Sequence, residues 1–106
     1  MSMRIALVAL LLIACKSEPR TPRGSCQTAA TCEDYQGDGK FVDGQRAACK
    51  GVGTWSDAAC PTANLLGSCR ETHGWTRTRH HYVGTSQVID KIKVECGAYG
   101  TWVEPK

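Results

Sequence analysis

The cysteines constrain this chain more than any other feature of its sequence. Seven occur in 106 residues, whereas large apolar side chains that could build a core are few and scattered. A domain of this length is only marginally stable on hydrophobic burial alone, and small exported domains compensate with disulfides. Cys15 directly follows an apolar run. The other six are an even number, which in an exported chain predicts three disulfides: Cys26, Cys32, Cys49, Cys60, Cys69 and Cys96.

The N-terminus has the pattern of an export signal. Arg4 supplies a short positive start, and residues 5–14 form an uncharged apolar run of ten residues. Such a run is too short to cross a hydrocarbon core of ~30 Å as a helix, which needs ~20 residues. It has the length of the apolar region of a signal peptide, so residues 1–14 are predicted to be one.

The end of this run carries a lipidation motif. Residues 12–15 read Leu-Ile-Ala-Cys and resemble the lipobox of bacterial lipoproteins at all four positions. The resemblance implies cleavage before Cys15, diacylglycerol on its sulfur and a further acyl chain such as palmitate on the new amino group. Several acyl chains anchor a protein stably, whereas one gives marginal binding. Lys16 rather than Asp at the position after Cys15 favours sorting to the outer membrane. The alternative to a lipoprotein signal is an ordinary secretory signal.

Two cysteine-rich repeats are predicted after a tether. Residues 15–25 hold the lipidated cysteine and a linker with two prolines and no large apolar side chain. Residues 26–59 and 60–106 each carry three cysteines in order, and in both the third is followed by three residues and then Gly-Thr-Trp. Gly37 and Gly74 also share the fifth position after the middle cysteine. This shared order predicts a duplicated unit.

The repeats narrow the choice of disulfide pairing. Six cysteines allow fifteen pairings, but an odd number in each repeat requires at least one bond between repeats. Each closed loop is expected to stabilise the domain by about 3 kcal/mol. The symmetric solution is our prediction: Cys32–Cys49 and Cys69–Cys96 within the repeats, and Cys26–Cys60 between them.

The predicted fold class is α+β, a small disulfide-rich domain in which each repeat has short antiparallel strands and a short helix carrying its third cysteine. Residues 76–83 are polar and β-favouring and predict a strand. Residues 87–96 fit either a helical or a strand pattern, and the alanine-rich segment 45–50 at the matching place favours helix for both. Short strands are expected at 54–55 and 101–103, with Trp55 and Trp102 as core anchors.

Residues 32–37, residues 60–69 and the Gly-Thr-Trp motif that ends at Trp102 together resemble small cysteine-rich lipoproteins and secreted proteins predicted from genomes of environmental Gram-negative bacteria. The resemblance covers residues 26–102 and implies an architecture and an address in the cell envelope. It implies no activity. The chain differs from the group in having Ala98-Tyr99 before Gly100, where a second glycine is common.

No motif for catalysis or for a cofactor is present in the sequence. The cysteine spacings exclude the close pairs used for zinc, haem or thioredoxin-like chemistry. Residues 34–45 faintly resemble a calcium-binding EF-hand loop, but Gln45 replaces the bidentate Glu, so we expect a polar turn. We therefore expect no enzyme, no metal and no cofactor. A net charge of +3 is too small to indicate nucleic acid.

The candidate binding face lies on the predicted strand 76–83. Arg77, Arg79 and His81 alternate along it and therefore share one face. Trp75 lies directly before them, outside the repeat pattern. Cations beside an aromatic ring suit an anionic, ring-bearing ligand such as an envelope glycan. The alternative is a solvated strand face.

The expected function is that of a membrane-anchored extracytoplasmic lipoprotein, a binding or envelope-structural module without a catalytic centre. Its partners would be membrane lipid, through Cys15, and an envelope glycan or protein. One alternative is a secreted inhibitor or toxin-like scaffold. Another is a small envelope hydrolase, for which only His73, His80 or His81 could supply the base.

Overall fold

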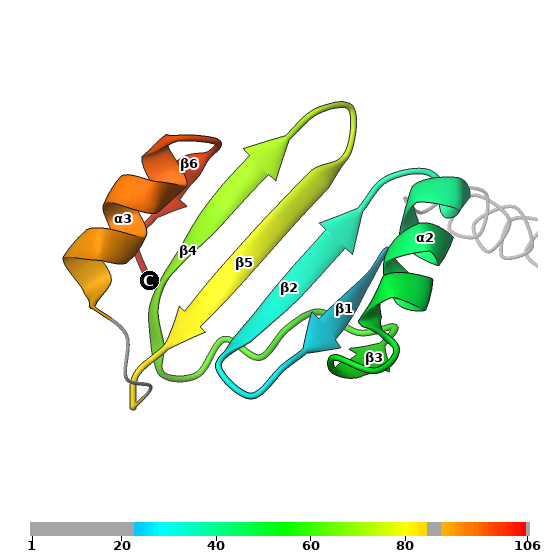
Figure 1. The fold of residues 1–106 in the computed structure, drawn as a ribbon, viewed down its shortest axis with the longest axis horizontal. Coiled ribbons are helices and arrows are strands. Elements are labelled where there is room, and N and C mark those ends of the chain that lie inside the picture. The colour runs from blue at the N-terminus through cyan, green and yellow to red at the C-terminus, as the bar shows by residue number, and fades with distance from the viewer. Residues whose placement is uncertain (1–22, 85–87, 106) are drawn as a thin grey trace, which may run out of the picture.

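The structure, a computed structural model, describes residues 23–84 and 88–105. These residues form one six-stranded antiparallel sheet of order β3-β1-β2-β5-β4-β6 and two helices (Figure 1). The elements are β1 Arg23–Gln27, β2 Thr31–Gln36, α2 Gly39–Cys49, β3 Thr54–Ser56, β4 Leu65–Thr72, β5 Thr76–Tyr82, α3 Ile89–Gly97 and β6 Thr101–Val103. The prediction of a small disulfide-rich α+β domain is confirmed, and the sheet dominates it.

Several helices and strands occur where the sequence predicts them, but α2 begins earlier than predicted and β1 begins within the predicted tether. β3, β5, α3 and β6 occur where the sequence predicts them. Helix α2 begins earlier than expected, because the Asp38 side chain caps it by accepting a hydrogen bond from the Phe41 N–H at 2.8 Å. Most of the predicted polar turn at 34–45 is therefore helix. β1 begins at Arg23, so the end of the predicted tether belongs to the sheet.

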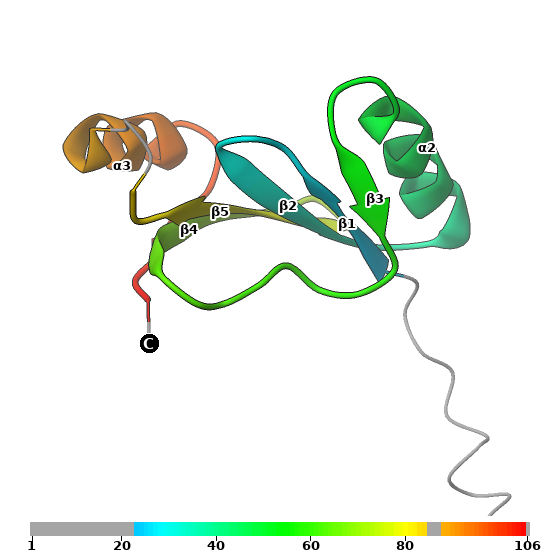
Figure 2. The same ribbon diagram turned by 90° about the horizontal axis from the view of Figure 1, so that it is seen from below.

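The two faces of the sheet differ in what covers them. Both helices lie on one face, and the connection from β3 to β4 crosses the other (Figure 2). Successive residues of a strand point to opposite faces. Cys26 pairs in register with Glu33, so these two residues share a face, and Cys32 points to the opposite one.

This alternation decides the disulfides. The bonds are Cys26–Cys49, Cys32–Cys60 and Cys69–Cys96. The prediction of Cys69–Cys96 is confirmed, and those of Cys32–Cys49 and Cys26–Cys60 are wrong. Cys26 faces the helices and meets the end of α2, whereas Cys32 faces the crossing connection that carries Cys60.

The core consists mainly of the disulfides and a few rings. All six bonded cysteines are buried, together with Tyr35 and Val42. The Tyr35 ring stacks on Trp55 at 5.9 Å between centroids. The indole of Trp55 lies directly over Gly24, where a Cβ would come within 2.0 Å of the ring atom Cζ2. Trp102 covers Gly67 in the same way, at 2.1 Å. Both tryptophans thus pack on the sheet as predicted core anchors, although each is partly exposed.

Candidate functional site

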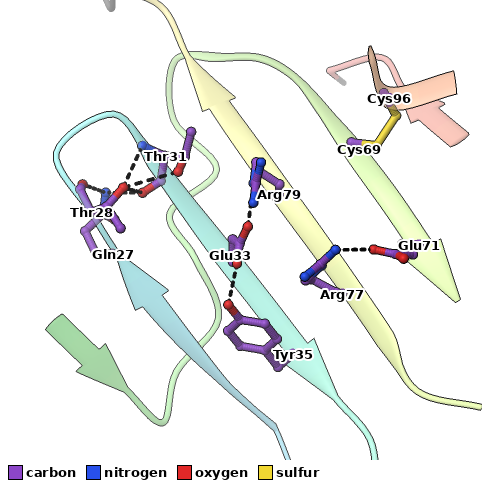
Figure 3. A network of polar contacts seen from close by, with 10 residues as sticks. All are labelled: Gln27, Thr28, Thr31, Glu33, Tyr35, Cys69, Glu71, Arg77, Arg79 and Cys96. Carbon is purple, nitrogen blue, oxygen red and sulfur yellow. Dashed lines mark hydrogen bonds and ion pairs between the residues drawn. A yellow bond between two sulfur atoms is a disulfide. The ribbon is translucent and has the colours of Figure 1, made fainter. Parts of the chain in front are cut away.

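Two of the four predicted binding residues form one group on the helix-bearing face of the sheet. Arg77 and Arg79 lie on β5, in the middle of the sheet, with α2 and α3 at its two ends (Figures 1 and 3). β2 lies beside β5 and contributes Glu33 and Tyr35 to the same face. We call Glu33, Tyr35, Arg77 and Arg79, together with Glu71 of β4, the central strip.

The positive charges of the central strip are neutralised. The Arg79 guanidinium donates to the Glu33 carboxylate, and Arg77 donates to Glu71 (Figure 3). Both arginine side chains stay partly exposed, at 43% and 34%, while the two glutamates are largely covered. Two cations and two anions sum to zero. The strip therefore has no surplus charge for an anion, but its guanidinium groups can still reach solvent.

Tyr35 completes this hydrogen-bonded row. Its hydroxyl donates to Glu33, so one carboxylate joins Tyr35 and Arg79 (Figure 3). Burial, the hydrogen bond to Glu33 and the charge of Glu33 raise the pKa of Tyr35 well above its usual range, so the phenol stays protonated. A cavity of about 310 Å³ opens beside the row and is lined by Glu33, Tyr35 and Arg79 together with Gln45 of α2.

The other two predicted site residues take part in packing. His81 is buried, and its ring lies 5.9 Å from that of Trp102. Trp75 is half-buried and stacks on Phe41 at 4.8 Å, with the rings 10° from parallel. The structure therefore groups Arg77 and Arg79 with β2, and places Trp75 and His81 in separate aromatic contacts.

A second polar group lies on the opposite, helix-free face. The Ser68 Oγ lies 2.6 Å from His80 Nδ1, and His80 Nε2 lies 2.7 Å from Asp34 Oδ2. The other oxygen of Asp34 accepts a hydrogen bond from the Cys60 N–H at 2.8 Å. Three strands, β4, β5 and β2, thus supply one hydrogen-bonded chain of Ser68, His80 and Asp34.

A cavity of about 730 Å³ adjoins this chain. Ser68 and His80 line it, as do the apolar side chains of Leu65 and Val103. Arg70 also lines it, two residues after Ser68 on the same face of β4, and makes no ion pair with any residue that the structure describes. Among the described residues, Arg70 therefore offers an unpaired guanidinium at this cavity, on the face opposite to Arg77 and Arg79.

Asp34, His80 and Cys60 also place potential metal-ligating atoms within 4.8 Å of one another. The sulfur of Cys60 is bonded to Cys32, so the oxidised domain offers only a carboxylate and an imidazole there. Structural metal sites need about four ligands. The oxidised domain therefore supplies two of these ligands, fewer than a structural zinc site uses.

The Ser68–His80–Asp34 chain escaped the sequence analysis because its members come from strands whose pairing is not local. One signal was available. The tripeptide Gly-Ser-Cys occurs twice, at 24–26 and at 67–69. In both places the glycine lies under a tryptophan and the cysteine is bonded to a helix.

Among residues 23–84 and 88–105, no helix is long and apolar enough to cross a membrane. Three disulfides in so small a domain indicate an oxidising, extracytoplasmic environment. Residues 1–14 and Cys15, predicted as signal peptide and lipidation site, lie outside the described residues. No protein-family model, curated protein or solved structure matches the chain.

Proposed function

We propose that this chain is an exported, lipid-anchored binding module of the bacterial cell envelope. The observation that carries the proposal is the cysteine pairing. The six cysteines of the folded domain are bonded to one another, so within this chain Cys15 has no cysteine left to pair with. An exported chain with a single unpaired cysteine, placed at the end of an apolar run that resembles a lipobox, is best explained by acylation of that cysteine.

The position of Cys15 would hold the domain close to the membrane. Eight peptide units separate Cys15 from Arg23, where β1 begins. Even a fully extended chain of this length reaches only about 28 Å. An anchored domain would therefore act on ligands at the membrane surface, in the outer membrane if Lys16 directs sorting there.

We also propose that the domain arose by duplication of one strand–strand–helix–strand unit. The support is a set of matching contacts. Cys26 pairs in register with Trp55, and Cys69 pairs with Trp102. Each of these two cysteines is bonded to the helix of its own segment. On this alignment Cys26 corresponds to Cys69, rather than to Cys60.

The ligand surface we propose is the central strip with its adjoining cavity. Because its two ion pairs sum to zero charge, it suits the hydroxyl groups of an envelope glycan better than a strongly anionic group. Partly exposed Arg77 and Arg79 can donate hydrogen bonds to such a ligand, and Gln45 can contribute from the cavity.

The anchor is tested by replacing Cys15. Cys15→Ser should move the protein from the detergent phase of a Triton X-114 extraction to the aqueous phase, and should abolish incorporation of labelled palmitate. Gly44→Ala, in an open position of α2, is the matched control and should leave both unchanged. Unchanged partitioning of Cys15→Ser would refute the lipid anchor and favour a secreted scaffold.

The binding surface is tested with a charge-neutral double variant. Glu33→Gln with Arg79→Gln removes one ion pair and keeps the net charge. We expect sedimentation with purified peptidoglycan sacculi to fall at least fivefold, with little dependence on salt because the strip is neutral. Equal sedimentation of variant and parent would show that the pair serves only the fold.

A further inference from the structure

We propose that Ser68, His80 and Asp34 form an acyl-transfer centre that acts on carboxylic esters. This activity goes beyond binding and departs from the expectation of a chain without catalysis. It uses the helix-free face of the sheet and depends neither on the lipid anchor nor on the central strip. The proposal is carried by the geometry of the three side chains, by the cavity beside them and by a contrast with Ser25.

The hydrogen bonds assign a role to each group. Ionised Asp34 can only accept, so His80 must donate to it from Nε2. In the neutral imidazole the other nitrogen, Nδ1, then carries a lone pair, and it faces the Ser68 hydroxyl at 2.6 Å. This is the protonation state in which a histidine can remove the proton of a serine. The Cys60 N–H holds Asp34 in place at 2.8 Å, in a segment that a disulfide ties to β2.

The surroundings favour the reaction. Only 13% of the His80 side chain is exposed, and Ser68 is buried in the sheet but lines the cavity of about 730 Å³. Interactions among polar groups strengthen where water is excluded. The cavity volume lies in the range of small-molecule sites. Leu65 and Val103 give it an apolar wall for an acyl chain, and Arg70 supplies a cation for the oxyanion that forms during attack.

Ser25 shows that a buried serine in this sheet need not have such partners. It occupies the matching place in β1, inside the other Gly-Ser-Cys, and is equally buried. Ser25 pairs in register with Asp34, whereas Ser68 pairs with His80. The Ser25 hydroxyl donates to the carbonyl oxygen of Ala58 at 2.8 Å. Of these two serines, only Ser68 faces a base, so Ser25 serves as an internal control.

The chemistry balances in two steps. The Ser68 oxygen bonds to the ester carbonyl carbon while its proton passes to His80 Nδ1. The bond to the leaving alcohol then breaks, and the alcohol takes that proton. In the second step water attacks the acyl group on Ser68, again giving a proton to His80, and Ser68 recovers it as the carboxylic acid leaves. Asp34 is a positioning residue that holds the imidazole and stabilises its transient positive charge.

The test uses the full oxidised chain in detergent and a fluorophosphonate probe, which reacts with activated serines. We expect one adduct per chain, located on Ser68 by peptide mapping of the parent protein. That location requires no variant, so it stands even where a substitution disturbs folding. Ser68→Ala should abolish labelling, and Ser25→Ala should retain it. An adduct elsewhere, or no adduct on folded protein, would overturn the proposal.

Turnover of p-nitrophenyl butyrate distinguishes the role of His80 as base from that of Asp34 as positioning residue. His80→Ala should lower the rate at least 100-fold, within the usual contribution of general base catalysis. Asp34→Asn should lower kcat at least tenfold while KM stays within twofold, which a loss of binding alone would not produce. Release of acetate from O-acetylated peptidoglycan, or of fatty acid from phosphatidylglycerol vesicles, identifies the source of the ester. Parent-like turnover by Ser68→Ala would contradict the centre, whatever the result for the anchor.

Discussion

Residues 23–56 and 65–103 use the same framework and place different chemistry on it. In each segment a helix cysteine is bonded to the first strand, and a tryptophan of the last strand covers a glycine of the first. The tryptophan of each also lies under a helix cation: Arg46 is 5.5 Å from the Trp55 ring, and Lys93 is 5.8 Å from the Trp102 ring. The segments differ at the strand positions that lie between the disulfide and the packed tryptophan.

The differences meet where the segments join. Ser25 of β1 pairs in register with Asp34 of β2, and Ser68 of β4 pairs with His80 of β5. On the same two strand pairs, Cys26 pairs with Glu33 and Cys69 pairs with Arg79. Because β2 pairs with β5, the acids of one segment contact the bases of the other. Acidic side chains of the first segment and basic side chains of the second, at matching strand positions, thus build both polar groups of the sheet.

Removal of either matching disulfide, Cys26–Cys49 or Cys69–Cys96, is expected to lower the free energy of unfolding more than any other change. Their sequence separations are 23 and 27 residues, for which the chain-entropy relation gives about 3.5 kcal/mol each. Cys26→Ala with Cys49→Ala should therefore lower the free energy of unfolding about as much as Cys69→Ala with Cys96→Ala. Urea denaturation measures both. If one double variant lost twice as much unfolding free energy as the other, the two disulfides would not be equivalent.

The glycines under the tryptophans give the next effect. Gly24→Ala should destabilise the domain by about 1–3 kcal/mol, because its Cβ would overlap the Trp55 ring. Gly67→Ala should cost about 1 kcal/mol more, since Gly67 also has a φ of +151°. Thermal unfolding of each variant checks the order. Gly44→Ala, an open helix position, is the control and should not destabilise. Equal stability of Gly24→Ala and the parent would contradict the packing.

What the sequence predicts and what it misses follow from how local each signal is. β5 and the short strands at Trp55 and Trp102 depend on patterns within a few residues, and they are found. The local pattern of α3 fits either a helix or a strand, and the comparison with residues 45–50 selects the helix. The Cys26 and Cys32 pairing depends on which face of the sheet each residue occupies. The face that each cysteine occupies is unknown until β1 is recognised as a strand. The two prolines before β1 and Gly24 within it instead favour a linker.

For the same reason the sequence predicts only part of the central strip and does not assemble the Ser68–His80–Asp34 chain. Alternation along one strand places Arg77 and Arg79 together. It cannot show that Glu33 and Glu71 neutralise them, because these acids come from neighbouring strands. The same alternation places His80 on the opposite face, but it cannot identify the partners Ser68 and Asp34, which lie 12 and 46 residues away in the chain. Aligning the segments on Gly-Ser-Cys would have indicated both the matching disulfides and this pair of strands.

A smaller effect is expected from the helix cations. Arg46→Met and Lys93→Met keep most of the alkyl stem and remove the charge over each tryptophan. Each should cost about 0.5–1 kcal/mol, because both side chains are partly exposed. Chemical denaturation in matched buffers measures the two losses. If only one of the two variants lost stability, only one tryptophan would be stabilised by the cation of its helix.

The smallest effect distinguishes the segments by pH. Burial acts to raise the pKa of Glu71, but hydrogen bonds and charges from Arg77 and His73 outweigh it and hold the pKa below its ordinary value of 4.5. A lowered folded-state pKa contributes stability above the ordinary value that is lost as the pH falls through the folded-state pKa. At the matching place the first segment has the uncharged Thr28–Thr31 contact.

Below pH 4.5, amide exchange in residues 65–82 should therefore accelerate relative to residues 23–36. Hydrogen-exchange mass spectrometry measures both segments in one sample. Glu71→Gln should remove most of this difference. Faster exchange of the first segment on acidification would contradict the role of the Glu71–Arg77 pair.

Each segment has a disulfide from its helix to its first strand. The most direct test of this arrangement is to map the disulfides of the oxidised protein. Cys26 and Cys32 share one tryptic peptide, since Arg23 and Lys40 flank both. Partial reduction with differential alkylation is therefore needed to separate them. We predict bonds of Cys26 to Cys49, Cys32 to Cys60 and Cys69 to Cys96, with no free thiol among the six. Bonds of Cys32 to Cys49 and Cys26 to Cys60 would contradict the fold, the matching of the two segments and the position of Asp34 beside His80.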